Sequence, residues 1–249
     1  MNIVVCVKRV ADSETRIRIA GNRTSIDPAA VKFVMNPYDE FALEAALRQR
    51  ESEGTGEVTL LTVGPGESAE TLRAGLALGA DQGVLLKAES VSEGMAVASA
   101  LAEELRQRQF DIVLFGFKAI DDDLQAVGPM VAQLLDIPAV TAVSEFTVEG
   151  GRVVAQREVD GGVEVVELKT PCAMSLTKGP HAPRYASLKG IMAAKKKPLE
   201  EKTANIGAQG IRTVAMDYPP DRKAGQILTG GADSVPDLLR LLHEEARIL

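Results

Sequence analysis

The chain is poor in the residues that mark several common classes of protein. It has no tryptophan and only 4% aromatic residues, so it gives no sign of a stacking platform for bases or sugars. Its two cysteines, Cys6 and Cys172, lie far apart, and its two histidines, His181 and His243, accompany neither a nucleophile motif nor an HExxH pair. The sequence therefore predicts no disulfide framework, no metal site and no catalytic constellation of the hydrolase type.

Long hydrophobic runs and an excess of positive charge are also missing. No apolar run approaches the ~18 residues that a membrane-spanning helix needs, which predicts no membrane insertion. A formal net charge of -7 argues against general nucleic-acid binding, because that function uses a basic face. The start does not resemble a signal peptide, and with so few cysteines we expect a cytoplasmic protein.

What the chain does have is a regular alternation of strands and helices. Apolar runs typical of strands buried on both faces of a parallel sheet lie at 2–7, 58–63, 84–86 and 111–115. Segments with helical spacing begin at Asn36-Pro37 and run over 67–78, 92–108 and 124–135. This pattern predicts an α/β fold with a Rossmann-like, doubly wound parallel sheet.

The second half of the chain follows a different pattern. Short strands are expected at 140–148, 152–159, 163–168 and 173–176, and the first three are separated by Gly-Gly hairpin turns. These strands predict an antiparallel β extension. Residues 177–210 have little periodicity and much proline, glycine and lysine, which predicts a surface arm, and 234–249 is amphipathic. We therefore expect an α/β domain with a β extension at 1–180, and an arm with a C-terminal segment at 181–249.

Three consecutive carboxylates, Asp121, Asp122 and Asp123, follow the strand at 111–115, where an open parallel sheet presents its ligands. They could cap the next helix, ligate a metal, or accept hydrogen bonds from a ribose or an adenine. The pattern favours the helix cap, and no second acidic motif supports a metal. Glycines after the strands, such as Gly64 and Gly116, fit a phosphate site and simple turns equally well.

Six motifs, in order along nearly the whole chain, closely resemble the beta subunit of electron transfer flavoprotein. They are Val7-Lys8-Arg9-Val10, Met35-Asn36-Pro37-Tyr38, Gly79-Ala80-Asp81, Ala119-Ile120-Asp121-Asp122-Asp123, Arg157-Glu158-Val159-Asp160-Gly161-Gly162, and Pro183-Arg184-Tyr185-Ala186-Ser187-Leu188 with the Ile191-Met192 and Lys195-Lys196-Lys197 that follow.

The resemblance implies a subunit of a heterodimer and no enzyme activity of the chain alone. It also implies that 1–180 is a nucleotide-binding domain, and that 181–249 is a partner-recognition arm with a C-terminal segment that wraps on the alpha subunit. The alpha subunit of that family carries most of the contacts to a redox-active FAD, and the beta subunit buries an AMP. The heterodimer takes electrons from acyl-CoA dehydrogenases and related flavoprotein dehydrogenases and passes them toward a membrane quinone oxidoreductase.

Position by position, the resemblance also implies three groups of site residues. The AMP contacts would be Cys6, Asn36, Pro37, Tyr38, Asp39, Val63, Gly116, Phe117, Lys118, Ala119, Ile120, Asp121, Asp122, Asp123, Leu124, Gln125, Ala126 and Val127. The contacts to partner dehydrogenases would be Arg184, Tyr185, Leu188, Ile191 and Met192, with Leu188 as the anchor. Arg157 and Glu158 would contact the alpha subunit near its flavin.

Two alternatives stay open. The ending Val127-Gly128-Pro129 resembles the electron-bifurcating branch, whose beta subunit binds a second FAD in place of AMP, but that branch usually has glycine where this chain has Asp122. A carboxylate there favours AMP, because the larger ligand needs room and tolerates added negative charge poorly. The other alternative is a free-standing adenine-nucleotide sensor, which would leave the arm and the Arg157-Glu158 motif without a role.

Overall fold

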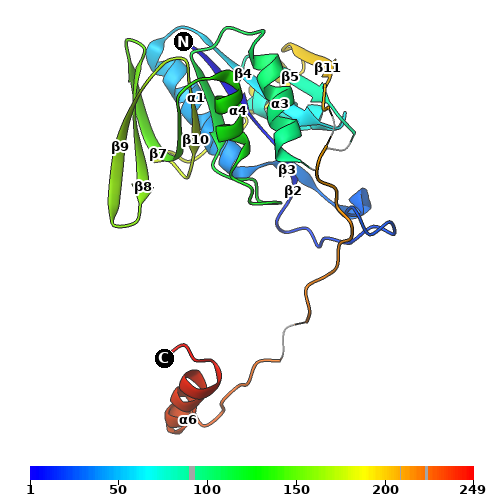
Figure 1. Ribbon diagram of the computed structural model, residues 1–249, viewed down its shortest axis with the longest axis vertical. Coiled ribbons are helices and arrows are strands. Elements are labelled where there is room, and N and C mark those ends of the chain that lie inside the picture. Colours follow the sequence, from blue (N-terminus) through cyan, green and yellow to red (C-terminus); the bar gives the residue numbers. More distant parts are fainter. Residues whose placement is uncertain (90–92, 208, 222–223) are drawn as a thin grey trace. The chain divides into compact units, whose positions relative to one another are not determined.

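A large, mostly parallel sheet organises residues Met1–Met216, the first of two units into which the chain divides (Figure 1). The structure is a computed structural model and describes residues 1–89, 93–207, 209–221 and 224–249. Within those ranges the sheet has nine strands in the order β11-β5-β4-β1-β6-β10-β7-β8-β9. Their bounds are β1 Asn2–Cys6, β4 Glu57–Gly64, β5 Gln82–Lys87, β6 Ile112–Gly116, β7 Ala139–Glu149, β8 Arg152–Val159, β9 Gly162–Lys169, β10 Cys172–Leu176 and β11 Leu199–Thr203.

Helices cover both faces of the parallel part of the sheet. Leucines of α1 (Pro37–Glu53) and α2 (Ser68–Leu78) pack in one core cluster with Ile3 and Leu60. Residues of α3 (Gly94–Leu105) and α4 (Val127–Leu135) pack in a second cluster with Val4 and Val113 on the other face. This confirms the doubly wound α/β fold that the alternating pattern predicts. The residue expected to open the third helix, Ser92, lies outside the described residues.

The direction of winding reverses between β1 and β6. The chain passes from β1 through α1 to β4 on one side, and from β5 through α3 to β6 on the other side of β1. Because α1 and α4 then lie on opposite faces, a crevice opens outside the carboxyl ends of these strands.

The antiparallel extension is confirmed, with one correction. β7, β8 and β9 pair in antiparallel fashion through the two hairpin turns, in which Gly150, Gly151 and Gly161 have φ of 56°, 80° and 85°. β10 is not part of this meander. It lies between β6 and β7 and pairs in parallel with both, so it returns the chain to the central sheet.

The expectation of an irregular arm over 177–210 is wrong in part. This segment contains the short helix α5 (Leu188–Ala194) and the strand β11, which extends the sheet in parallel beside β5. The sequence Leu-Glu-Glu-Lys-Thr does not look like a buried strand, because an edge strand leaves most of its side chains in water. A small antiparallel sheet of β2 (Arg9–Ala11) and β3 (Phe33–Met35), and the 3-10 turn η1 (Pro28–Ala30), are further elements that the pattern does not predict.

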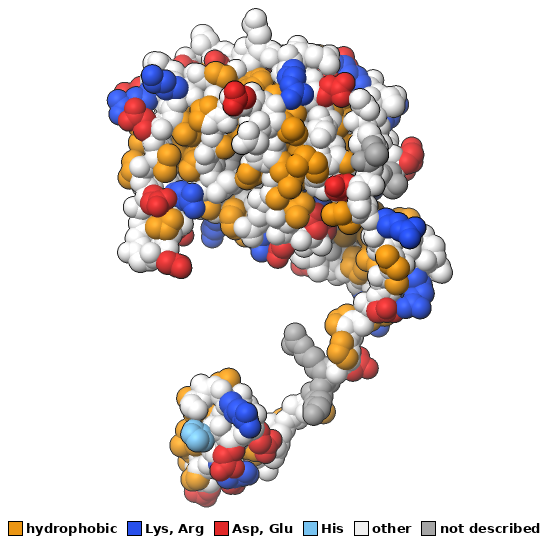
Figure 2. All heavy atoms as spheres, in the orientation of Figure 1, with side chains coloured by type: hydrophobic (Ala, Val, Ile, Leu, Met, Phe, Trp, Pro, Cys, Tyr) orange, Lys and Arg blue, Asp and Glu red, His pale blue; other side chains and the backbone are white. Residues whose placement is uncertain are grey.

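The second unit, Asp217–Leu249, contains the 3-10 turn η2 (Gly231–Ser234), the helix α6 (Val235–Arg240) and the π-helical turn η3 (Leu241–Glu245). The amphipathic pattern at 234–249 predicts such helical structure. None of the residues of these three elements is buried. Its exposed apolar side chains include Ile227, Leu238, Leu239 and Ile248, and Figure 2 shows hydrophobic atoms at the surface of this unit. The functional roles expected for 1–180 and 181–249 stay predictions.

In the described part of the chain, no helix has both the length and the apolar character that crossing a bilayer requires.

Candidate functional site

A cleft with a volume of 560 Å³ opens at the carboxyl ends of β1, β4 and β6, at the crevice where the winding reverses. The structure brings most of the expected nucleotide contacts together in its wall. These are Cys6, Asn36, Asp39, Val63, Gly116, Phe117, Lys118, Ala119, Asp122, Leu124, Gln125, Ala126 and Val127. The other expected contacts, Pro37, Tyr38, Ile120, Asp121 and Asp123, are neighbours of lining residues but do not line the cleft themselves.

Asp39 ties together the three elements that meet at the floor of the cleft. Its Oδ2 accepts a hydrogen bond from the Lys8 backbone N–H at 2.7 Å, just after β1. Its Oδ1 accepts from the Gly116 N–H at 3.1 Å, at the end of β6, and from the Asn36 side-chain amide at 2.9 Å. The side chain is only 5% exposed. Burial raises the pKa of Asp39 to about 7, although these three hydrogen bonds act in the opposite direction.

Asn36 holds the loop after β6 instead of capping α1. It occupies the N-cap position, but its side chain makes no capping bond to the helix. Its amide nitrogen donates to the Lys118 carbonyl at 2.9 Å, and its Oδ1 accepts from the Ile120 N–H at 3.2 Å. The Asn-Pro start of α1 is therefore as predicted, and although Asn is a common helix cap, the Asn36 side chain does not cap α1.

The acidic triplet also has a different role from the favoured one. α4 begins at Val127 with Ala126 at its N-cap, and no side chain caps it, so the expected helix start at 124 and the cap by Asp121, Asp122 or Asp123 are wrong. The carboxylates instead hold the loop in place. Lys8 Nζ lies 2.8 Å from both Asp121 Oδ1 and Asp122 Oδ2, and Lys118 Nζ lies 3.0 Å from Asp123 Oδ1.

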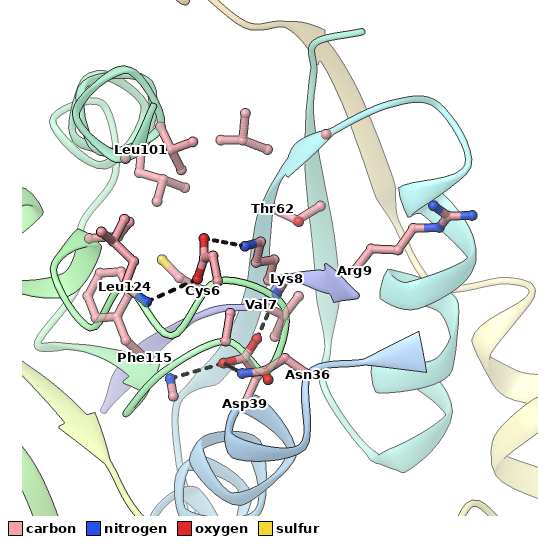
Figure 3. A pocket seen from close by; sticks show the side chains of 18 of the residues that line it. Cys6, Val7, Lys8, Arg9, Asn36, Asp39, Thr62, Leu101, Phe115 and Leu124 are labelled. Atoms are coloured by element: carbon pink, nitrogen blue, oxygen red, sulfur yellow. Dashed lines mark hydrogen bonds and ion pairs between the residues drawn. The ribbon is translucent and has the colours of Figure 1, made fainter. Parts of the chain in front are cut away.

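Lys8 is, with Arg9, one of the cations in the cleft wall that the list of expected contacts omits. Figure 3 shows it pointing into the cleft from the end of β1, with Leu101 of α3 on the opposite side from Asp39. Burial acts to lower the pKa of Lys8, but the hydrogen bonds and charges of Asp121 and Asp122 outweigh it and raise that pKa. The signal was present in the sequence, since Lys8 directly follows a buried strand.

Two hydroxyl groups in the cleft wall have no hydrogen-bond partner within the described chain. They are Thr62 Oγ1, at the end of β4, and Ser68 Oγ, at the start of α2, and both residues are 1% exposed. A buried polar atom without a partner costs free energy, so a ligand that supplies one is favoured. Sequence patterns did not single out either residue, because a lone Thr or Ser carries no motif.

The remainder of the wall is largely apolar. It includes Phe33, Leu61, Leu101, Phe115 and Leu124. Cys6 also faces it, and burial raises the pKa of its thiol far above the ordinary value, with a further contribution from the charge of Asp39. Cys6 is therefore a neutral packing group and not a nucleophile. Within the described residues no cluster of His, Cys, Asp or Glu is arranged to hold a metal ion.

The expected partner-docking residues lie far along the chain, around α5. Tyr185 and Leu188 are 98% and 84% exposed, and Ile191 and Met192 also face water. Arg184 differs from these four, because its guanidinium turns inward to Glu44 and Glu51 of α1. The Ser187 hydroxyl accepts from the Gly190 N–H and caps α5.

Arg157 and Glu158, the expected contacts to a partner subunit, lie next to each other on β8 and point to opposite faces of the extension. Arg157 Nε lies 3.5 Å from Glu164 Oε2 on β9. This buried nitrogen forms an ion pair there but has no hydrogen-bond partner in the described chain. Glu158 is exposed.

Comparison with known proteins gives a consistent result over the whole chain. Residues 24–206 match the family model of the electron transfer flavoprotein domain. Electron transfer flavoprotein subunit beta from Bradyrhizobium diazoefficiens is 40% identical over 253 residues, which cover 100% of both chains. The subunit from Bacillus subtilis is 35% identical over 260 residues, again 100% of both chains, and that from Homo sapiens is 37% identical over 256 residues, which cover 100% of this chain and 99% of the other.

Proposed function

The chain belongs to the electron transfer flavoprotein family as a beta subunit, and from this membership we propose that it binds AMP in the cleft, pairs with an alpha subunit that holds most of the FAD, and docks flavoprotein dehydrogenases. In this complex the beta subunit is an electron-transfer component without a catalytic residue of its own. We expect the complex in the cytoplasm, passing electrons from dehydrogenases of the acyl-CoA type toward a membrane quinone oxidoreductase.

The AMP proposal rests on the wall of the cleft, which lies where the winding of the doubly wound sheet reverses. This wall contains buried polar groups without hydrogen-bond partners. The cleft volume of 560 Å³ falls in the range of small-molecule sites, about 300–1,000 Å³. Thr62 and Ser68 hydroxyls have no partner, Lys8 presents a cation that Asp121 and Asp122 already pair, and the apolar wall suits a purine ring. Val127 and Gly128 at the start of α4 line the cleft, and N–H groups at a helix start, which have no partner within the helix, would fit a phosphate.

A second FAD in place of AMP is the alternative, and the main feature that favoured it has a structural explanation. A Cβ on Gly128 would lie 3.2 Å from the ring of Phe115, so this glycine lets α4 pack on β6 whatever the ligand is. Asp122 lines the cleft and is held by Lys8, which keeps a carboxylate near the ligand. The first point leaves Gly128 neutral between the two ligands, and the second favours the smaller nucleotide.

The alpha subunit would cover surfaces that the chain leaves apolar and exposed. These include Leu238 and Leu239 on α6, and Ile248. The partly exposed guanidinium of Arg157 and the exposed carboxylate of Glu158 offer a donor and an acceptor on the extension. FAD supplies the redox chemistry when the heterodimer is assembled, and the residues of this chain position and shield it.

One measurement tests the ligand assignment directly. The chain is co-expressed with its alpha subunit, the purified heterodimer is denatured with acid, and the released FAD and AMP are counted. We expect one FAD and one AMP per heterodimer. Two FAD and no AMP would establish the bifurcating alternative, and a chain that is stable alone and exchanges ATP with AMP would establish the sensor.

A further inference from the structure

The docking segment, residues 183–192, combines strong exposure with a fixed backbone. Tyr185 and Leu188 are almost fully in water, and Met192 is exposed too. Apolar side chains on a free loop would tend to collapse onto the protein. Here the chain on both sides of the exposed residues is attached to the two helices on the same face of the sheet, α1 and α2.

The N-terminal attachment is a clasp between Arg184 and two carboxylates of α1. Arg184 Nε lies 2.7 Å from Glu44 Oε2, and Nη1 lies 2.6 Å from Glu51 Oε1. The Arg184 backbone N–H also donates to Glu44 Oε2 at 3.2 Å. The clasp therefore fixes both the side chain and the backbone of residue 184, one residue before the exposed Tyr185.

Glu44 is built into the fold as the receiving half of this clasp. Its side chain is 2% exposed, and its other partner is Arg48, whose Nε lies 2.6 Å from Glu44 Oε1. Burial acts to raise the pKa of Glu44, but the hydrogen bonds and charge of Arg184, with help from Arg48, outweigh it and lower that pKa. A buried carboxylate needs such partners, so the position of Arg184 is strongly specified.

The C-terminal attachment is a pair of reciprocal caps between α5 and α2. Arg73 of α2 donates to the carbonyls of Ala194 and Lys197, at 2.6 and 2.8 Å. Lys197 Nζ donates in return to the carbonyls of Leu76 and Ala80, at 3.0 and 2.5 Å. Carbonyl groups at and just beyond the end of each helix are thus satisfied by a cation from the other segment, Arg73 of α2 or Lys197 after α5.

We propose that Arg184 is a positioning residue for partner docking: its clasp to Glu44 and Glu51 holds the docking segment in one conformation, so that Leu188 is presented ready to enter an apolar pocket on the dehydrogenase. This inference rests on the proposed docking function and deepens it. Arg184 does not touch the partner in this arrangement, because its guanidinium is occupied by α1. Its contribution is to reduce the ordering that binding would otherwise require.

The test uses the assembled heterodimer and the rate at which an acyl-CoA dehydrogenase reduces it. Arg184→Gln should raise the KM of the dehydrogenase for the heterodimer about tenfold and change kcat less than about twofold. The reason is that the order of the docking segment affects binding of the dehydrogenase and not electron transfer between the bound flavins. Hydrogen exchange of the amides at 185–194 should become faster. Arg184→Lys keeps the positive charge but lacks the planar guanidinium that can bind two carboxylates at once. Its KM should therefore lie between the values of wild type and Arg184→Gln.

Two control variants separate this inference from the others. Arg48→Gln removes the other cation from Glu44 without touching the docking segment, and should leave KM and exchange unchanged. Leu188→Ala tests docking itself. If Leu188→Ala raises KM and Arg184→Gln does not, the positioning role is wrong and docking stands; if neither changes KM, the docking function is wrong.

A variant that removes half of the clasp covers the case in which Arg184→Gln fails to assemble. Glu51→Gln leaves the buried Glu44 paired with Arg184 and disrupts only the exposed contact. It should give a smaller rise in KM and faster exchange at 185–187. Unchanged KM and exchange in Glu51→Gln would then overturn the inference.

Discussion

Gly116 lies directly against the carboxylate of Asp39. Its N–H donates to Asp39 Oδ1 at 3.1 Å, and a Cβ on residue 116 would lie 2.2 Å from the same oxygen and 2.8 Å from the Asp39 backbone nitrogen. The end of β6 and the start of α1 can therefore approach this closely only if residue 116 is glycine. This contact forms the floor of the cleft.

Gly116→Ala should push β6 and α1 apart and deform the cleft. We expect a loss of about 1–3 kcal/mol in the free energy of unfolding, as for other insertions into packed sites, and a heterodimer purified with little AMP. Gly66→Ala is the matched control, because a Cβ there meets nothing within 4 Å. Full AMP content in Gly116→Ala would show that the floor contact does not matter for binding.

The titration of Asp39 gives a second prediction. Its pKa is raised from 3.8 to about 7 in the folded chain by burial. The folded chain therefore binds this proton more tightly than the unfolded chain does. The stabilisation that Asp39 contributes is fully present below about pH 4 and is lost as the pH rises through about 7.

Denaturation of wild type and Asp39→Asn over this range measures the effect, because asparagine cannot titrate. The free energy of unfolding of wild type relative to Asp39→Asn should decrease as the pH rises from about 4 to about 7, with a slope of at most about 1.4 kcal/mol per pH unit. Parallel curves for the two proteins would mean that the hydrogen bonds from Lys8, Asn36 and Gly116 keep the carboxylate ionised throughout.

How far the sequence predicts this molecule depends on whether the signal is local. The apolar runs of β1, β4 and β6 and the spacing of the helices predict the sheet and its order of elements, because burial on both faces leaves a continuous pattern. The pattern did not predict β11, because an edge strand carries polar residues. It placed β10 in the antiparallel extension, because the parallel pairing of β10 with β6 depends on residues sixty positions away.

The same limit applies to the candidate site. Strand ends and glycines predict where the cleft lies, and the family resemblance adds the residue positions. No pattern predicts that Asn36 binds the loop and not the helix, or that Asp121 and Asp122 bind Lys8, since each contact joins residues more than eighty positions apart. The unpaired hydroxyls of Thr62 and Ser68 are visible only once the packing around them is known.

Gly190 gives a prediction for the docking segment that does not involve charge. A Cβ at this position would lie 2.4 Å from the Ala77 carbonyl oxygen, so α5 rests with its backbone on the end of α2. Gly190→Ala should lift α5 away from α2 and disturb the position of Leu188. The KM of the dehydrogenase for the heterodimer should rise several-fold, at a cost in stability of about 1–3 kcal/mol.

The AMP content of Gly190→Ala should not change, because Gly190 lies outside the cleft proposed for AMP. Gly162→Ala serves as the control, since that position is also on the surface and a Cβ there meets nothing within 4 Å. Wild-type KM in Gly190→Ala, measured together with a raised KM in Leu188→Ala, would show that docking tolerates movement of α5.

The second unit provides the last prediction, which concerns assembly. Leu238 and Leu239 of α6 are exposed, and α6 and the turns on either side of it contain no buried residue, so this unit has no core that depends on them. Exposed apolar clusters of this kind are typical of surfaces that a partner covers. The double substitution Leu238→Ser with Leu239→Ser should therefore weaken pairing with the alpha subunit by about tenfold, since a loss of about 0.7 kcal/mol at each of two apolar contacts adds up to about 1.4 kcal/mol, which corresponds to a tenfold change. The unfolding of Met1–Met216 should stay unchanged.

Co-purification and sedimentation measure the pairing. Arg240→Gln is the control, because it removes the exposed ion pair to Glu244 on the same helical turns. Undiminished heterodimer in the double variant would assign the alpha-subunit contact to the first unit alone.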